Sequence, residues 1–468
     1  MSRRTILHAA DIHLDSPMQR LRSYENAPVE QLRGATRRAL TNLVDLAIER
    51  QVDLVVIAGD LYDGDWPDSN TGLFFVGQAQ RLTQAGIPMV IIRGNHDAAN
   101  QMTGHLPLPK NPDGTAMMLD DQQVDRRIWE HLGIAVHGKS YRTRAEKSDL
   151  SAAYPPPLRG MFNLGLLHTS LSGLEGHAPY APCNPGQLAD KEYDYWALGH
   201  IHLRGEHHLP GSAPIVFSGN LQGRHVRETG PKGCLLVEID DQNRPTSTFH
   251  PLDVARWEIC EIDAADVDHE DEIFDRFESW IAEALSEVDD RLLVPRVRLQ
   301  GRSRQHDRWL AHQKSIESSL RAIAVANGGG QVWLERFRVE TESLASVQSS
   351  PNTQSNEVDD GPRGSIQAIA DELMTPNGEI TPSSFVHQSL EELRRKLPSE
   401  LTRSESQPDL SGDDSSNAFD DGEASMALVR EATAELFSRL HGTERPKQST
   451  AGIGPPKPAA RNKERASS

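Results

Sequence analysis

The sequence predicts an α/β sandwich flanked by helices, followed by a small α+β unit and a largely disordered acidic C-terminal region. Two observations predict the α/β class. Short apolar runs such as 53–58 and 88–92 are typical of buried parallel strands. Segments with helical spacing of apolar residues accompany them, over 35–50 and 70–85. Together with a strand at 4–10, this alternation predicts a parallel sheet with right-handed crossover helices.

Later segments divide the chain into domains. Within a first domain at residues 1–250, we expect further strands at 134–137, 162–167, 194–198, 214–218 and 233–238. The pattern then changes, and residues 251–340 predict a small α+β unit with strands near 256–262, 292–299 and 331–339 and helices near 269–286 and 306–326.

The C-terminal part has three segments of different composition. Residues 341–422 are rich in serine and acidic residues and read as a partly disordered linker with short helices. Residues 423–441 have the apolar spacing of an amphipathic helix, which would either dock a partner or pack on its own chain. Residues 442–468 form a basic, proline-rich tail.

Composition gives weaker constraints. The 468 residues carry a net charge of -19, which argues mildly against a nucleic-acid binder. Much of the acid lies in the C-terminal third, and bound metal ions would add positive charge. The 3 cysteines form no C-x-x-C pair, which suits a reducing compartment. We see no signal peptide and no membrane span, and therefore expect a cytoplasmic protein.

Five short polar motifs follow predicted strands in order. They are Asp11-Ile12-His13, Gly59-Asp60, Gly94-Asn95-His96-Asp97, His168 and Gly199-His200-Ile201-His202. Imidazole and carboxylate are the ligands expected for pairs of manganese, iron or zinc ions. Each motif alone has an ordinary explanation, such as a capped turn or a satisfied histidine. The ordered set predicts a site for two adjacent divalent ions, a standard device for attack on a phosphate ester.

The spacing within the motifs suggests how they share the ions. Asp60 follows a strand and a glycine and is the natural bridging carboxylate. Asp11 and His13 are two apart in a segment expected to be extended, so both would face one ion. His200 and His202 have the same spacing and could each serve a different ion. Two further ligands complete the set: the side-chain carbonyl of Asn95 and the imidazole of His168.

These motifs resemble the calcineurin-like metallophosphoesterase superfamily, whose pattern is D-x-H, G-D-x-x-D, G-N-H-D/E, a lone H and G-H-x-H. The resemblance implies the metallophosphoesterase β-sandwich and two divalent metal ions. It assigns one ion to Asp11, His13, Asp60 and His202, and the other ion to Asp60, Asn95, His168 and His200. It further implies that water attacks phosphorus while the ions spread the developing negative charge.

The same resemblance assigns roles to His96 and Asp63. His96 would protonate the leaving oxygen or donate to the phosphate. Asp63, at the last position of G-D-x-x-D, would pair with that histidine and raise its pKa. We interpret Asp97 as a helix cap. Archaeal and eukaryotic nucleases of the wider family carry a histidine where this chain has Asp63, whereas the bacterial branch commonly has an aspartate there.

Within the superfamily, the chain looks most like the SbcD-type DNA repair exonucleases, and specifically their YhaO-like subgroup. The residues that carry this likeness are 8–17, 166–170, 195–202, 219–225 and 228–233. The protein-phosphatase pattern G-D-x-V-D-R-G is absent. The resemblance implies a manganese-dependent phosphodiesterase acting on DNA as an exonuclease, with endonuclease activity as a further option. It also implies an SMC-like (SbcC-type) ATPase partner and a capping role for residues 251–340.

Basic residues beside the motifs are candidates for substrate phosphates. They are Arg93, Arg204, Arg224 and His225, with hydrogen bonding within the protein as the ordinary alternative. Two other functions stay open. One is a phosphodiesterase of the same fold acting on a small molecule such as a cyclic nucleotide, and the other is a non-catalytic scaffold for an SMC-like ATPase. A homodimer is also left open, as are exonuclease polarity and the native metal.

Overall fold

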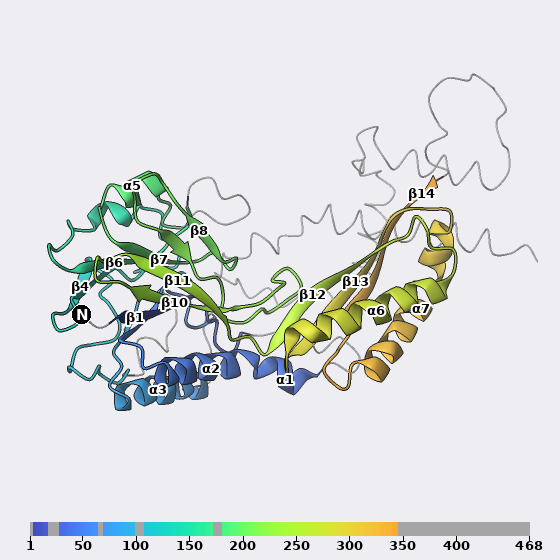
Figure 1. Ribbon diagram of the computed structural model, residues 1–468, viewed down its shortest axis with the longest axis horizontal. Helices are drawn as coiled ribbons and strands as arrows, with labels where there is room; N and C mark the ends of the chain where they lie inside the picture. Colours follow the sequence, from blue (N-terminus) through green and yellow to red (C-terminus); the bar gives the residue numbers. More distant parts are fainter. Residues whose placement is uncertain (1–2, 17–27, 64–68, 99–106, 172–179, 345–468) are drawn as a thin grey trace, which may run out of the picture. The chain divides into compact units, whose positions relative to one another are not determined.

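The computed structural model describes residues 3–16, 28–63, 69–98, 107–171 and 180–344 (Figure 1). The predicted helix at 423–441, the tail at 442–468 and nearly all of the linker at 341–422 lie outside the described residues.

The first sheet has five strands in the order β11-β10-β1-β2-β3. Their bounds are β1 Arg4–Ala9, β2 Leu54–Ile57, β3 Met89–Ile91, β10 Gly233–Ile239 and β11 Pro245–Pro251. β1, β2 and β3 are parallel, whereas β10 runs antiparallel to both β1 and β11. The carboxyl ends of β1, β2 and β3 therefore lie side by side at one edge of the sheet.

The second sheet has six strands in the order β4-β5-β6-β7-β9-β8. Their bounds are β4 Asp125–Trp129, β5 Ile134–Gly138, β6 Phe162–His168, β7 Tyr195–Gly199, β8 Gly205–His207 and β9 Ile215–Phe217. The four central strands are parallel, and the edge strands β4 and β8 run antiparallel to their neighbours.

Apolar side chains pack these sheets into layers. One buried cluster joins strands of both sheets, with Val56 and Leu166 among its members, so the sheets form a sandwich. A second cluster joins the five-stranded sheet to α2 (Ala35–Glu49) and α3 (Ser69–Gln84), which lie beside that sheet in Figure 1. A third cluster joins the six-stranded sheet to α5 (Pro185–Ala189). Alternating apolar and helical segments thus fold as the predicted α/β sandwich.

The predicted strands and helices of residues 1–250 occur within a residue or two of their expected positions. Sequence patterning missed the strands β4, β8 and β11 and the short helices α1 (Val29–Arg33) and α5. The three missed strands are all at sheet edges and are mostly half-buried or exposed. Edge strands of this kind need no continuous apolar run, and therefore lack the signal that revealed the central strands.

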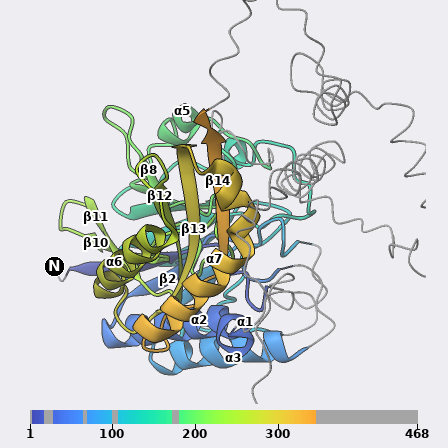
Figure 2. The same cartoon turned by 90° about the vertical axis from the view of Figure 1, so that its right-hand side faces the viewer.

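A separate sheet follows, in the order β12-β13-β14. Its elements are β12 Ala255–Asp263, α6 Glu270–Val288, β13 Leu292–Ser303, α7 His306–Asn327 and β14 Arg336–Ser343. Both strand pairs are parallel, so this unit is α/β, and the expected α+β class is wrong for it. Figure 2 shows α6 and α7 together on one face of the sheet, where Phe277, Trp309 and Phe337 are fully buried in a core of their own.

Candidate metal centre

The polar motifs meet at one end of the sandwich because each follows a parallel strand of one of its two sheets. Asp11 and His13 follow β1, Asp60 follows β2, and Asn95 follows β3. From the other sheet, His168 is the last residue of β6, and His200 and His202 follow β7. The carboxyl ends of neighbouring parallel strands are where open α/β sheets bind their ligands.

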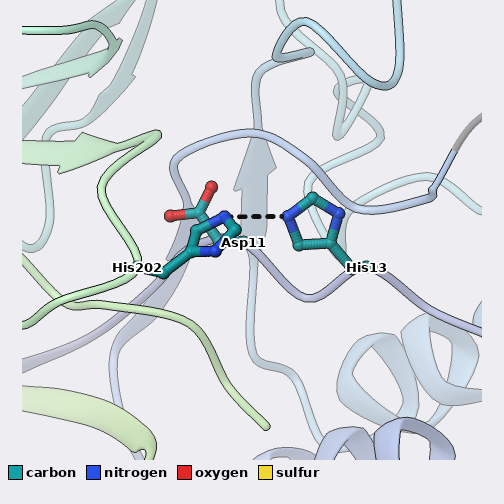
Figure 3. A group of neighbouring side chains, drawn as sticks. All are labelled: Asp11, His13 and His202. Carbon is teal, nitrogen blue, oxygen red and sulfur yellow. Dashed lines mark hydrogen bonds between the residues drawn. The ribbon is translucent and has the colours of Figure 1, made fainter. Parts of the chain in front are cut away.

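One group of candidate ligands consists of Asp11, His13 and His202, whose ligand atoms all lie within 4.8 Å of one another. Figure 3 shows the His13 and His202 imidazoles facing each other, with Nε2 atoms 3.1 Å apart, and the Asp11 carboxylate beside them. Nδ1 of His202 lies 2.8 Å from Oε1 of Glu228. A proton held on Nδ1 by this carboxylate leaves the Nε2 lone pair facing His13, as in metal-bound histidines.

A second group consists of Asp11, Asp60 and His168, all buried. Nε2 of His168 lies 3.4 Å from Oδ2 of Asp60 and 3.0 Å from the side-chain oxygen of Asn95. Asp60 also lies 3.9 Å from Nε2 of His13, so its carboxylate stands between the two groups. This is the position that a bridging carboxylate would need.

His200 is placed differently from the other predicted ligands. Its imidazole ring lies 5.3 Å from that of His168 and 5.7 Å from the Tyr180 ring, centre to centre. Its backbone N–H donates to both oxygens of Asp11 at 3.1 Å. Among the described residues it is not part of the compact ligand groups, so its assignment to an ion stays a prediction.

The backbone at these motifs is not extended, so the expectation that Asp11 and His13 lie in an extended segment is wrong. Asp11, His13 and Asp60 have φ values of 50°, 45° and 51°, and His200 has 97°. Non-glycine residues rarely adopt this left-handed region, and such strain is concentrated at functional sites. Asp11 and His13 therefore converge through left-handed turns of the chain, and not through the two-residue periodicity of a strand.

Motif glycines leave room for His168. A β-carbon at Gly59 would lie 2.4 Å from Nδ1 of His168, and one at Gly94 would lie 2.2 Å from Oδ1 of Asp60. A β-carbon at Gly199 would lie 2.0 Å from the carbonyl oxygen of Ala58. That same carbonyl accepts a hydrogen bond from Nδ1 of His168 at 2.8 Å. The glycines of three motifs thus let backbone and ligands approach closely around a single imidazole.

The donor set fits divalent metal ions. Nδ1 of His168 donates its proton to the carbonyl oxygen of Ala58, so Nε2 of the same ring faces two oxygen acceptors, from Asp60 and Asn95. Lone pairs that face each other require a cation or a proton between them. Ligands that bind one ion at about 2.0–2.2 Å lie roughly 3 Å apart, which matches these separations. Imidazole, carboxylate and amide oxygen together suit manganese, iron or zinc.

Burial and charge interactions inside the cluster move several pKa values strongly. Burial opposes protonation of His168, but the charges of Asp60 and Asp11 raise the pKa of His168 to about 9. Burial lowers the pKa of His13 to about 3, with the Arg224 charge acting in the same direction. Burial raises the pKa of Asp11 to about 6 against the opposing effect of nearby histidines. A buried set of acids and bases held in this way is typical of a functional site.

His96 and Asp63 form the expected pair. Nδ1 of His96 lies 2.9 Å from Oδ1 of Asp63, and both side chains are about one-fifth exposed. Burial alone would lower the pKa of His96, but the charges of Asp60 and Asp63 raise it to about 9. The backbone N–H of His96 donates to Asp60 at 2.9 Å, which ties this histidine to the ligand cluster. His96 thus lies beside the candidate ligands, with its pKa raised by two neighbouring carboxylates.

The sequence predicted no role for Glu228, although the residue lies in the segment 228–233, which resembles the SbcD-type exonucleases. Its carboxylate accepts hydrogen bonds from Nδ1 of His202, from Asn220 at 3.0 Å and from the backbone N–H of Arg224 at 2.7 Å. Burial opposes its charge, but Arg224 and His202 hold the pKa of Glu228 well below its usual range. Glu228 therefore orients His202, a function that no local pattern reveals.

The four basic candidates for substrate contact have different surroundings. Arg224 is largely buried and lies 3.4 Å from Asp63 and 3.1 Å from Glu228, so it is part of the site network. Arg93 pairs with Asp121 at 2.9 Å. Arg204 is exposed and follows His202 by two positions, and its guanidinium lies over the Phe249 ring. His225 is also exposed and lies 3.8 Å from Glu228.

The helix that Asp97 was expected to cap would follow it at residues 99–106, which lie outside the described residues, so that role stays a prediction. The buried Asp97 carboxylate accepts hydrogen bonds from the backbone N–H groups of Leu61, Tyr62 and Gly94, at 2.9–3.1 Å. Asp97 therefore anchors the loop that follows Asp60 to the loop that carries Asn95. In the described part of the chain, no helix has both the length and the apolar character needed to cross a membrane.

Comparison with known proteins agrees with this geometry. The family model for calcineurin-like phosphoesterases matches residues 4–204, and a model for the middle domain of the metallophosphoesterase YhaO matches residues 257–342. The chain is 30% identical over 348 residues to the uncharacterized metallophosphoesterase YhaO of Bacillus subtilis, covering 73% of this chain and 83% of that protein.

Two further relatives have names that refer to nucleic acid. The DNA double-strand break repair protein Mre11 of Sulfurisphaera tokodaii is 28% identical over 251 residues, covering 51% of this chain and 60% of that protein. One of the subunits of the nuclease SbcCD of Staphylococcus epidermidis is 24% identical over 298 residues, covering 58% of this chain and 74% of that protein. On the extent of its likeness to YhaO and on its motifs, the chain belongs to the calcineurin-like metallophosphoesterases, a family of metal-dependent hydrolases with a dimetal centre.

Proposed function

We propose that this protein is a manganese-dependent DNA nuclease, an exonuclease with endonuclease activity as a further option. The observation that carries the proposal is the His96–Asp63 pair, 2.9 Å apart beside the shared carboxylate Asp60. The leaving group of a nucleic-acid phosphodiester is a sugar alkoxide, which needs a proton as the bond to phosphorus breaks. A protonated imidazole held by a carboxylate is suited to supply it.

The ligand assignment follows the resemblance. In this proposal Asp11, His13, Asp60 and His202 would hold one ion, and Asp60, Asn95, His168 and His200 would hold the other. When bound, the ions would neutralise the phosphate oxygens and make a water molecule nucleophilic at neutral pH.

The protein's own residues position and protonate. His96 donates its proton to the leaving oxygen, and Asp63 keeps the imidazole oriented and charged for that step. Arg224 lies on the opposite oxygen of Asp63 and restrains that carboxylate. Glu228 fixes the tautomer of His202, so that Nε2 faces the cluster.

The proposed substrate and partner are inferred from the names of the relatives. One relative is named as a DNA double-strand break repair protein and another as part of the nuclease SbcCD. We infer DNA as the substrate, a role in DNA repair and an SbcC-type ATPase as partner. Residues 251–340, which coincide with the YhaO middle-domain match at 257–342, would then be a capping domain. The 3 cysteines are free and buried, which supports a cytoplasmic location.

The test is manganese-dependent digestion of linear double- and single-stranded DNA, with bis-p-nitrophenyl phosphate assayed in parallel. We expect DNA loss with manganese and none with EDTA. His96→Asn should lower the rate by at least 100-fold. His208→Asn is the matched control, because that side chain is 65% exposed and pairs only with Glu206 in the described structure. Hydrolysis of the small ester with DNA untouched, even with an ATPase partner, would instead favour a small-molecule phosphodiesterase.

A further inference from the structure

A small pocket lined by both polar and apolar residues adjoins the candidate metal centre. Its volume is about 150 Å³, and its lining includes His202, Arg204, Thr229 and Lys232. His202 belongs both to this pocket and to the group with Asp11 and His13. A ligand in the pocket would therefore be next to whatever the metal centre holds.

Two cations of the pocket have no ion-pair partner among the residues that the structure describes. Lys232 is only 6% exposed, yet no carboxylate oxygen there lies within 4.0 Å of its ammonium group. The Arg204 guanidinium lies 4.0 Å from the centre of the Phe249 ring and makes no salt bridge to any described residue. A buried lysine is normally paired, because an isolated charge is costly to remove from water.

Two of the three acidic groups whose charges act on Lys232 are bonded to other residues. Glu228 is bonded to His202, Asn220 and Arg224. Asp253 is bonded to Arg256 and Arg291. Burial lowers the pKa of Lys232; Glu228, Asp253 and Glu258 act against this shift at longer range, and Arg204 adds to it. None of the three acidic groups makes an ion pair with Lys232 in the described part of the chain, so the pocket, which Thr229 also lines, offers two cations to an added anion.

We propose that Lys232 and Arg204 form a subsite for a phosphate of a nucleic-acid strand, next to the phosphate that is cleaved. The inference rests on the proposed nuclease function, since only a substrate with successive phosphates occupies both places. Guanidinium binds phosphate oxygens in pairs, and lysine adds a point charge. Such backbone contacts position a strand without reading its sequence. An ester with one phosphate, such as bis-p-nitrophenyl phosphate, leaves the subsite unused.

Binding without turnover gives the first test. Affinity for a labelled single-stranded oligonucleotide is measured by fluorescence anisotropy in EDTA over a series of salt concentrations. Each lost phosphate contact should reduce the slope of log K against log salt by about 0.7. Lys232→Met should show this reduction. Arg244→Met is the control, because it removes one charge beyond the other end of β10, where the side chain is 72% exposed. Equal slopes for the two variants would overturn the subsite.

Kinetics give the second test, with manganese present. Lys232→Met should lower kcat/KM for the oligonucleotide about tenfold more than for bis-p-nitrophenyl phosphate, mainly through KM. Lys232→Arg, which keeps the charge, should restore most of the loss and guards against a folding defect. Equal losses on both substrates would overturn the subsite while leaving the nuclease proposal intact. A wild-type protein that neither binds nor cleaves DNA, yet hydrolyses the small ester, would overturn both.

Discussion

Replacing Gly94 by alanine tests the metal centre through a single added methyl group. That β-carbon would lie 2.2 Å from Oδ1 of Asp60 and 2.7 and 2.8 Å from Cε1 and Nε2 of His168. Non-bonded heavy atoms prefer separations of about 3.5–4.0 Å, so one of these buried side chains must move by about 1 Å. A misplacement of that size costs roughly 100-fold in rate. We expect kcat/KM on bis-p-nitrophenyl phosphate to fall by about that factor, with weaker metal binding.

Gly77→Ala is the matched control for this substitution. Gly77 lies inside α3, and a β-carbon there would meet nothing within 4 Å. Alanine in a helix interior is more favourable than glycine by about 0.5–1 kcal/mol, so the control should be slightly more stable and equally active. Metal affinity is measured by titration calorimetry, and folding by thermal melting. A Gly94→Ala protein with wild-type metal affinity and rate would refute the assignment of Asp60 and His168 as ligands.

Three further outcomes are expected. Glu228→Gln should weaken metal binding about 10–100-fold in calorimetric titration, whereas Glu206→Gln, on the exposed strand β8, should leave it unchanged. His8 is buried beside the Tyr195 hydroxyl, and burial lowers the pKa of His8 to about 3. As pH drops below about 6.5, His8 therefore binds a proton in the unfolded chain but not in the folded one, and the free energy of unfolding falls. Between pH 7.5 and 5.5, urea unfolding in EDTA should show about 1.4 kcal/mol more loss in the wild type than in His8→Gln, and equal losses would contradict this role. Manganese at 100 times its Kd should add about 2.7 kcal/mol of stability, and EDTA should reverse the rise in Tm; a Tm indifferent to both would count against a metal site.

The main elements of the fold and the ligand candidates could be predicted because their signals are local. A central parallel strand must be apolar on both faces, and a ligand at its carboxyl end follows that run directly. His168 at the end of β6 shows the case clearly: the buried run 162–167, apolar except for Asn163, ends at a buried histidine. Edge strands such as β11 carry no such run, since solvent covers one side, and patterning alone missed them.

Residues that orient the ligands gave no such signal, because their partners are distant in sequence. Asp97 lies 36 positions from the Leu61 N–H that it holds, and Glu228 lies 26 positions from His202. The local sequence around Asp97 predicts a helix cap and gives no sign of these long-range hydrogen bonds. Glu228 is one acidic residue among many. The left-handed backbone at Asp11 and His13 is likewise invisible to a two-residue periodicity. Such strain persists only where surrounding contacts determine it, and here those contacts come from both sheets. Local patterns therefore identify which side chains reach the site, whereas long-range hydrogen bonds decide which nitrogen or oxygen each one presents.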